Sequence, residues 1–380
     1  TALSAITFLA LEAIGGALTL TYGFSYVVLA VLLVSLIIFL LSMPIAVTAA
    51  RNGLDIDLLT RGAGFGYLGS TVTSLIYASF TFIFFALEAA IMAMALNMLF
   101  GLPLHVGYLI GSVVVIPLVT WGFTFISRFQ QFTHVCWLLL QLLPFVMILL
   151  RDSGAVTRWT HYQGFMSANG SFDLLQLGAI CSVLLSLVSQ VGEQVDQVRF
   201  LPAPQPGKSW KWWCGVIAAG PGWIVIGAVK IMLGSFLAVL AYENGFGTEL
   251  AVEPTHMYMV AFSYVTSSSS TMLALTGIFV VLSQLKINVT NAYAGSIAWS
   301  NFFLRLTHRH PGRVVWLFFN VGIALLLMEL GVYRVFEDIL GIYAVAATAW
   351  LGSVVADLTL NKWLGLRPRE IEFRRAYLYD

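Results

Sequence analysis

Long apolar segments follow one another along almost the whole chain, and they constrain its fold more than any other feature. Because backbone N–H and C=O groups find no partners in hydrocarbon, a run of about 20 apolar residues predicts a membrane-spanning helix. Ten such runs are present, with approximate bounds 3–22, 26–49, 69–99, 105–127, 132–150, 174–198, 212–241, 257–303, 313–331 and 335–360. The sequence therefore predicts an all-α membrane protein with about ten transmembrane helices.

Composition agrees with lipid as the main solvent. Hydrophobic residues make up 59% of the 380 residues and charged residues only 10%, against about 25% charged residues in soluble domains. The net charge of +1 argues against nucleic acid, which requires a basic face. The three cysteines and six histidines show no metal-ligand spacing, and no nucleophile lies beside a base. We therefore expect a lipid bilayer and a small-molecule substrate as partners, no cofactor or metal, no catalytic residue and no enzymatic activity.

The distribution of Lys and Arg predicts the orientation of the helices. If the first helix starts in the cytoplasm, most basic residues fall on the cytoplasmic side: Arg51, Arg61, Arg128, Arg199, Lys208, Lys211, Arg305, Arg309, Arg313, Lys362, Arg367, Arg369, Arg374 and Arg375. The opposite side holds only Arg151, Arg158 and Arg334. We expect a multi-pass protein of the cell inner (plasma) membrane, with the start and the end of the segment in the cytoplasm.

Ten helices divide into five and five, and an odd number in each half gives the halves opposite orientations. We expect one transmembrane core over 1–360, with a first repeat at 1–150 and a second at 174–360, followed by a basic cytoplasmic connector at 361–380. Since Thr1 is not a start methionine and apolar residues begin at once, we expect the chain to be a piece of a longer protein.

Two lysines and several carboxylates fall inside the expected spans: Glu12, Glu88, Glu193, Asp196, Lys230, Lys286 and Asp357. A charge at the centre of a spanning helix costs about 2.5–3.5 kcal/mol on insertion scales, so such residues usually face a cavity or a partner. Asp196 lies near a helix end, where it can pair with Arg199. Lys230 can snorkel or pair, and we assign it no role. Glu12, Glu88 and Lys286 lie deeper, in a functional site or a buried pair.

Two glycine-containing stretches predict breaks in the first and sixth helices. Gly15 and Gly16 follow Glu12, and Gly192 ends the stretch that begins at Ser189. Broken helices expose backbone groups that hold ions and substrates in many transporters. We expect these two breaks to face each other at the middle of the membrane.

Four stretches, in order along the chain, resemble the nucleobase:cation symporter family, which includes cytosine, purine, allantoin and hydantoin permeases. They are Asn52-Gly-Leu with Leu58-Leu-Thr-Arg61 and Phe65-Gly-Tyr-Leu-Gly-Ser70, then Asp196-Gln-Val-Arg199-Phe200, Asn288-Val-Thr-Asn291-Ala-Tyr293, and Gly352-Ser-Val-Val-Ala356-Asp357. The resemblance implies the leucine-transporter-like fold, in which helices 1–5 and 6–10 form an inverted repeat. It also implies a substrate site between helices 1, 3, 6, 8 and 10, with aromatic stacking on a flat heterocycle.

The candidate substrate-binding residues lie in these motifs or at the expected breaks: Glu12, Gly15, Phe84, Glu88, Ser186, Leu187, Gln190, Asn288 and Asn291. The resemblance assigns the helix 3 aromatic to Phe84 and the polar residue one turn later to Glu88. It places the helix 6 aromatic near Leu187, which has no ring, so an aromatic sandwich would be only half built. The helix 8 polar contact falls at Asn288 or Asn291.

A lysine occupies a place where sodium-coupled relatives carry hydroxyl groups. The two residues that precede the helix 8 motif are Lys286 and Ile287. An ammonium group there would repel a metal ion and could replace it, so we expect Lys286 to be a cation-site surrogate between helices 1 and 8. It should contact helix 1 carbonyls or a carboxylate, with Glu12, Glu193 and Asp196 as the possible charge partners.

The leading hypothesis is transport of a nucleobase-like or related nitrogen-rich heterocycle, independent of sodium and either proton-coupled or facilitated. The alternative is a transporter-like sensor that binds such a solute without pumping it. In that case the basic connector at 361–380 would lead to a downstream signalling domain. The same residues are also explained by the preference for positive charge on the cytoplasmic side.

Overall fold

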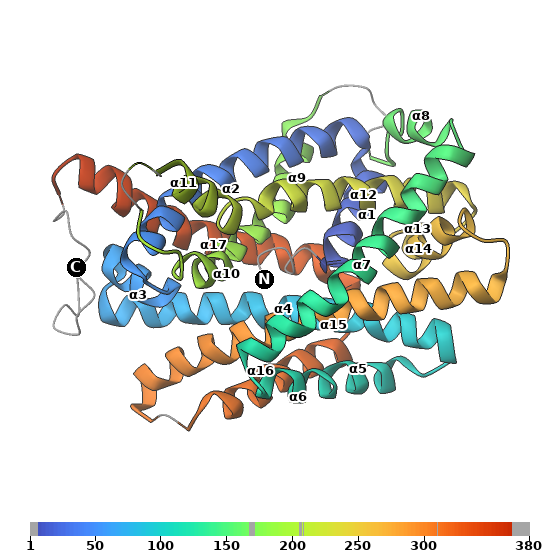
Figure 1. Cartoon of the computed structure of the whole chain (residues 1–380). Coiled ribbons are helices and arrows are strands. Elements are labelled where there is room, and N and C mark those ends of the chain that lie inside the picture. The colour runs from blue at the N-terminus through green and yellow to red at the C-terminus, as the bar shows by residue number, and fades with distance from the viewer. Residues whose placement is uncertain (1–6, 167–171, 205–206, 208, 310, 367–380) are drawn as a thin grey trace.

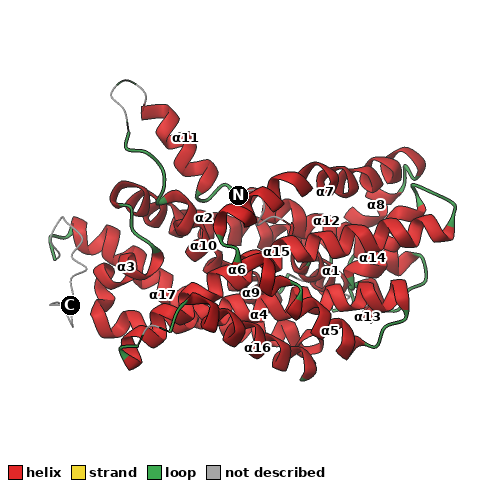
Figure 2. Cartoon of the chain, turned by 60° about the horizontal axis from the view of Figure 1, so that its bottom comes forward, coloured by secondary structure: helices red, strands yellow, loops and turns green. Residues whose placement is uncertain are grey.

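The computed structural model describes residues 7–166, 172–204, 207, 209–309 and 311–366, and within them the chain forms helices and loops without a strand (Figure 2). Seven helical segments are long and apolar enough to cross a membrane: Phe24–Asn52, Ile56–Phe100, Thr124–Arg151, Leu174–Val198, Ser209–Glu243, Ser269–Thr307 and Val332–Asn361. The other three expected spans correspond to shorter helices. The basic residues Lys208, Arg367, Arg369, Arg374 and Arg375 lie outside the described part.

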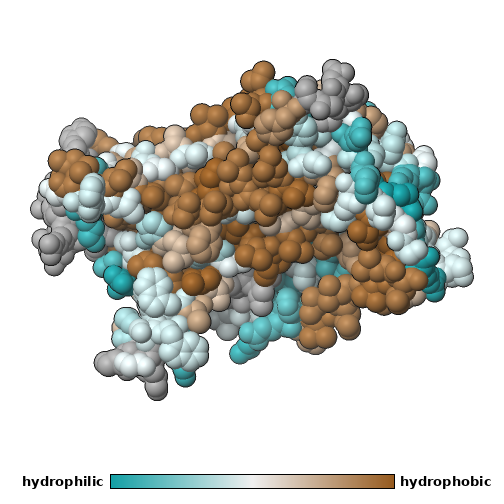
Figure 3. All heavy atoms as spheres, turned by 90° about the horizontal axis from the view of Figure 1, so that it is seen from above, coloured by the Kyte–Doolittle hydropathy of each residue, from teal (hydrophilic) through white to brown (hydrophobic). Residues whose placement is uncertain are grey.

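The surface of the helical bundle is apolar over a wide area. A broad hydrophobic region covers the middle of the face shown in Figure 3, and hydrophilic residues gather toward its edges. Phe132 and Leu175 are 88% and 83% exposed, and soluble proteins rarely expose apolar patches of this extent. The chain is therefore a multi-pass membrane protein.

The first half contains α1 (Ala10–Tyr22), α2 (Phe24–Asn52), α3 (Ile56–Thr60), η2 (Arg61–Phe65), α4 (Gly66–Phe100), α5 (Leu104–Val113), α6 (Val115–Thr120), α7 (Phe123–Arg151) and α8 (Ala155–Thr160). The fourth expected span, 105–127, ends at Thr120 instead. The chain turns at Gly122, whose φ of 86° favours glycine. Consequently α7 begins at Phe123, before the expected start at 132.

The second half contains α9 (Leu174–Leu185), η3 (Ser186–Ser189), α10 (Gln190–Val198), α11 (Ser209–Ala219), α12 (Trp223–Glu243), α13 (Thr248–Ala251), α14 (Pro254–Ser263), α15 (Ser269–Thr307), α16 (Arg313–Glu329), η4 (Val332–Val335), α17 (Phe336–Ala356) and η5 (Asp357–Asn361). The expected span 212–241 is two helices, because Gly220–Pro221–Gly222 interrupts it. The expected run 257–303 is also two, α14 and α15, and Ser268 caps the start of α15 by accepting a hydrogen bond from Thr271 N–H.

Two helix pairs form the centre of the bundle (Figure 1): α4 packs along α15, and α1 packs along α12. Small residues allow α1 and α12 to approach closely. A Cβ atom on Gly15 would overlap the carbonyl of Ile231, and one on Gly234 would overlap the backbone of Glu12. The predicted break at Gly15–Gly16 is therefore wrong, because these glycines pack a continuous helix against its neighbour.

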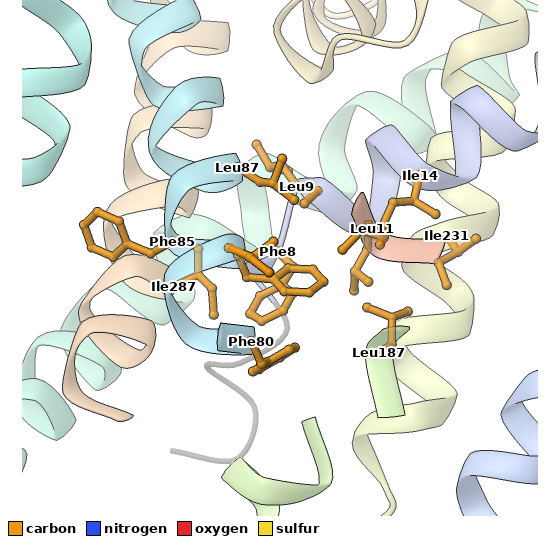
Figure 4. Packing of buried hydrophobic residues seen from close by; sticks show 14 of the residues in the cluster. Phe8, Leu9, Leu11, Ile14, Phe80, Phe85, Leu87, Leu187, Ile231 and Ile287 are labelled. Carbon is orange, nitrogen blue, oxygen red and sulfur yellow. The ribbon is translucent and has the colours of Figure 1, made fainter. Parts of the chain in front are cut away.

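The irregular backbone lies elsewhere in both helices. Phe8 and Leu9 precede α1, and Leu9 is its N-cap with φ and ψ already in the helical region, so the change in backbone geometry comes before Leu9. In the sixth expected span, the 3-10 segment η3 separates α9 from α10, and it ends at Ser189, where the predicted break begins. Figure 4 shows Leu187 of η3 and Leu11 of α1 in one hydrophobic cluster. The two irregular segments thus border the same interior.

Candidate substrate-binding site

Glu88 lies fully buried on α4 and holds the beginning of α1. Its Oε1 accepts a hydrogen bond from the N–H of Ala10 at 3.2 Å. The first N–H groups of a helix have no partners within it, and the helix dipole favours a negative charge beside them. The other carboxylate oxygen, Oε2, is buried without a partner among the described residues. Glu88 therefore keeps capacity to accept a further hydrogen bond.

An aromatic pair lies one turn before Glu88. The ring centroids of Phe84 and Phe8 are 6.0 Å apart with an interplanar angle of 30°, and Phe80 packs against Phe84 at 4.7 Å. Figure 4 shows Phe8 between α4 and the first turn of α1. Phe84 thus offers a stacking face, and Phe8 lies against it. Leu187, at the position expected for the second aromatic, is a buried aliphatic residue.

Three amide side chains form a stripe along α15. Gln284, Asn288 and Asn291 are separated by four and three residues, so they lie on one face of the helix. All three are 0% exposed, and neither the amide nitrogen nor the amide oxygen of Asn288 or Asn291 has a partner within the described part of the chain. Gln284 lies beside the Glu88 carboxylate. A buried polar group left unpaired costs about 1–3 kcal/mol, so this amide stripe is an unusual concentration of unused donors and acceptors.

Glu12, by contrast, anchors a buried network through its Oε1, while its Oε2 has no partner in the described residues. Its Oε1 is 2.9 Å from Lys230 Nζ on α12 and accepts a hydrogen bond from the Tyr258 hydroxyl on α14 at 2.7 Å. Gln141 of α7 donates to both Glu12 and Tyr258, and its amide oxygen accepts from Lys230 at 3.3 Å. Glu12 as the partner of Lys286 is therefore wrong, because Lys230 lies opposite it across the tightly packed α1–α12 pair.

Lys286 contacts a different helix from the expected one. Its Nζ donates to the Gln130 carbonyl at 3.0 Å and to Thr133 Oγ1 at 2.8 Å, and Gln130 Nε2 donates back to the Lys286 carbonyl at 2.7 Å. Both partners lie on α7. The predicted contact with helix 1 carbonyls or a carboxylate is not found in the described residues. Position 286 is about 200° around the helix from Gln284, which directs the ammonium away from the amide stripe and toward α7.

The polar residues of the sixth span are paired locally. Gln190 Nε2 donates to Glu193 Oε2 at 2.5 Å, and Ser186 Oγ donates to the Val183 carbonyl. Asp196 lies 3.6 Å from Arg199, which confirms the expected pairing at the helix end. Glu193 and Asp196 as charge partners of Lys286 are therefore wrong.

Several residues that build these two regions were not singled out from sequence. Gln284 extends the Asn288–Asn291 pattern by one turn, so helical spacing alone could have identified it. Lys230 was noted as a charge inside a span that can snorkel or pair, with no role assigned. Phe8, Gln141 and Tyr258 gave no local signal, because their contacts join segments that are distant in sequence.

No protein-family model matches the chain, and a search of curated proteins gives no significant match. Solved structures do resemble it. A structure of Mhp1, a nucleobase-cation-symport-1 family transporter, in a closed conformation with bromovinylhydantoin bound, has a TM-score of 0.70 at 18% identity, covering 98% of this chain and 80% of that chain. The inward-facing conformation of Mhp1 also gives 0.70, at 19% identity, with 95% and 76% covered.

The chain has the leucine-transporter-like fold. The similarity extends over nearly the whole chain, and the expectation drawn from the four motifs is thereby confirmed for the fold. At this level of sequence identity the comparison shows the fold alone, and the residues of the site determine which substrate can bind.

Proposed function

We propose that the chain transports a small, flat, nitrogen-rich heterocycle of the nucleobase type across a cell membrane. The observation that carries the proposal is the pair of unpartnered amides of Asn288 and Asn291, on the face of α15 where Gln284 lies beside Glu88. Side-chain amides both donate and accept hydrogen bonds, and an ionised carboxylate accepts them. The edge of a nucleobase-like ring carries the complementary N–H and C=O groups, so such a ligand would offset the cost of burying this stripe.

The fold supports the same substrate class. Mhp1 is described as a nucleobase-cation-symport-1 family transporter, and its closed conformation holds a hydantoin derivative. A hydantoin ring is flat and presents N–H and C=O groups on its edge. Phe84 supplies one stacking face for a ring of this kind, at the level of Glu88.

Sodium independence is part of the proposal and rests on Lys286. Lys286 is completely buried, and its ammonium group donates hydrogen bonds to Gln130 and Thr133 of α7. A fixed positive charge there disfavours a second cation nearby, since a buried charge without an opposite charge is costly. Transport would then be proton-coupled or facilitated.

We assign the protein to the plasma membrane, with both ends of the segment in the cytoplasm and with inverted repeats at 1–150 and 174–360. The sensor alternative, with a signalling domain after the connector at 361–380, has no support in the geometry of the described residues and stays a prediction.

Uptake into proteoliposomes tests the proposal. Radiolabelled uracil, adenine and hydantoin should be compared with glucose, with sodium or choline outside, and with or without a pH gradient. We expect saturable uptake of at least one heterocycle, equal in sodium and choline, and loss of it in Asn288→Leu. Asn97→Leu, which changes an exposed amide at the end of α4, is the matched control. No uptake of any heterocycle would contradict the substrate class, and strong stimulation by sodium would contradict the role of Lys286.

A further inference from the structure

The segment before α1 places two chemical groups in the candidate substrate site. The Phe8 ring lies against Phe84 with 30° between the ring planes. Two residues later, the Ala10 N–H donates to Glu88 Oε1. Both Phe8 and Ala10 are buried, at 2% and 3% exposure. A flat apolar ring and a polar N–H group are thus held side by side by the chain itself.

These are the two features that a nitrogen heterocycle would bring to the same residues. Its ring would stack on Phe84, and its N–H would donate to the Glu88 carboxylate. The heterocycle cannot make these contacts while the chain makes them, because Phe8 lies against Phe84 and Ala10 occupies the carboxylate oxygen. Figure 4 shows the Phe8 ring inside the hydrophobic cluster rather than at its edge.

Resting on the proposed function, we propose that Phe8 and the Ala10 N–H form an internal substrate mimic, and that the heterocycle binds by exchange with it. The ring of the ligand takes the place of Phe8 on Phe84, and the N–H of the ligand takes the place of Ala10 at Glu88. Binding therefore releases the beginning of α1 from α4. This assigns Phe8 as a residue that determines specificity: a ligand competes only if it has both a flat ring and an N–H donor.

Unpaired amides on α15 favour the ligand over Phe8 and Ala10 in this exchange. Phe8 packs against Phe84 and Ala10 donates to one Glu88 oxygen, but they leave the amides of Asn288 and Asn291 without partners in the described residues. A heterocycle with several edge groups would make the two contacts of the mimic and additional ones to the stripe. The gain from those additional hydrogen bonds favours the ligand over the mimic.

The same exchange links ligand binding to a conformational change. Phe8 lies outside α1, just before its N-cap Leu9, and Glu88 accepts a hydrogen bond from the first N–H group of the helix. Once the ligand replaces Ala10 at Glu88, the start of α1 loses its hydrogen bond to α4, while the rest of α1 stays packed along α12. Differential contacts of this kind are what a ligand needs in order to shift a conformational equilibrium.

Removing the mimic tests the inference. Because a competing internal contact reduces apparent affinity by the fraction of molecules in the open state, Phe8→Ala should bind uracil, adenine or hydantoin about tenfold more tightly than the unmodified protein, and Phe8→Leu should lie between them. Phe85→Ala is the matched control. It removes a buried phenyl ring from α4 that points away from Phe8 in Figure 4, and it should leave affinity unchanged. Binding is measured by scintillation proximity on detergent-purified protein.

Hydrogen–deuterium exchange gives a second readout. In the unmodified protein, the ligand should speed exchange of the amides at the beginning of α1, whereas bound ligands ordinarily slow exchange. Unchanged or weaker binding in Phe8→Ala, or slower exchange at the start of α1 with ligand, would overturn the mimic while leaving the proposed function intact. Absence of binding to both the unmodified protein and Phe8→Ala would overturn the proposed function and the mimic together.

Discussion

Two buried polar regions, one around Glu88 and one around Glu12, lie beside the beginning of α1, and they differ in how completely their polar groups are paired. Around Glu12, one carboxylate oxygen, an ammonium, an amide and a phenol hydrogen-bond to one another across α1, α7, α12 and α14, and Glu12 Oε2 is left without a partner in the described residues. Around Glu88, the amides of Asn288 and Asn291 have no partners in the described residues. In the first region, the polar groups hold helices together by pairing with one another. In the second, amide groups remain unpaired, which is typical of a site that binds a ligand.

Breaking the paired region should give the largest effect. Lys230→Met leaves the Glu12 carboxylate buried without its cation, and we expect the free energy of unfolding to fall by about 3–5 kcal/mol. Denaturant unfolding in detergent micelles measures this loss. The double variant Lys230→Met with Glu12→Leu removes both charges and should recover most of the stability. Equal losses in the single and double variants would show that the ion pair itself is not what stabilises the network.

The unpaired region should respond in the opposite way. Asn288→Ala and Asn291→Ala should each weaken heterocycle binding by about tenfold, since each removes hydrogen bonds made only to the ligand. The free energy of unfolding should change by less than about 0.5 kcal/mol, because the amides have no partners to lose. Asn320→Ala is the control, because Asn320 Oδ1 accepts from Trp299 at 3.1 Å and from Thr81 at 3.3 Å. It should cost about 1–3 kcal/mol of stability. Large destabilisation by Asn288→Ala would show that the stripe is structural.

A third variant tests the cation beside these regions. Lys286→Met removes two hydrogen bonds to α7, and we expect about 1–3 kcal/mol lower stability. Adding Ile287→Thr restores a hydroxyl, and weak stimulation of uptake by sodium should then appear. Uptake in sodium and choline gradients measures the difference. Sodium stimulation of the unmodified protein equal to that of the double variant would contradict the surrogate role.

Features that depend on local sequence pattern, such as the helical segments, could be predicted from the sequence. Hydrophobic runs located ten helical segments, and the resemblance to the family motifs assigned Phe84, Glu88 and Asn288 to the site, where the structure buries them. Pairing was harder, because it depends on which helices pack together. Gly15 and Gly16 looked like a break, yet they pack α1 on α12. That packing pairs Lys230 with Glu12, and Lys286 contacts α7 instead. The positions of the charges in the sequence alone did not determine which lysine pairs with Glu12.

The smallest effect is expected from an exposed counterpart of the Glu12–Lys230 pair. Arg158 of α8 donates to Asp152, which follows α7, and to Glu243 at the end of α12, both at 2.7 Å. The hydrogen bond from Arg158 lowers the pKa of Asp152 below its ordinary value. Stability from Asp152 is therefore fully present above the ordinary pKa of about 4 and is lost as the pH falls through the lower value of the folded state.

Between pH 8 and pH 5, this cluster should leave the free energy of unfolding unchanged, because Asp152 stays ionised and Arg158 stays protonated. Asp152→Asn should cost less than about 1 kcal/mol at pH 7, since the pair is solvent-exposed and screened. Denaturant unfolding at several pH values, with and without 1 M salt, measures both effects. A cost for Asp152→Asn as large as that of Lys230→Met would show that burial is not what separates the two ion pairs.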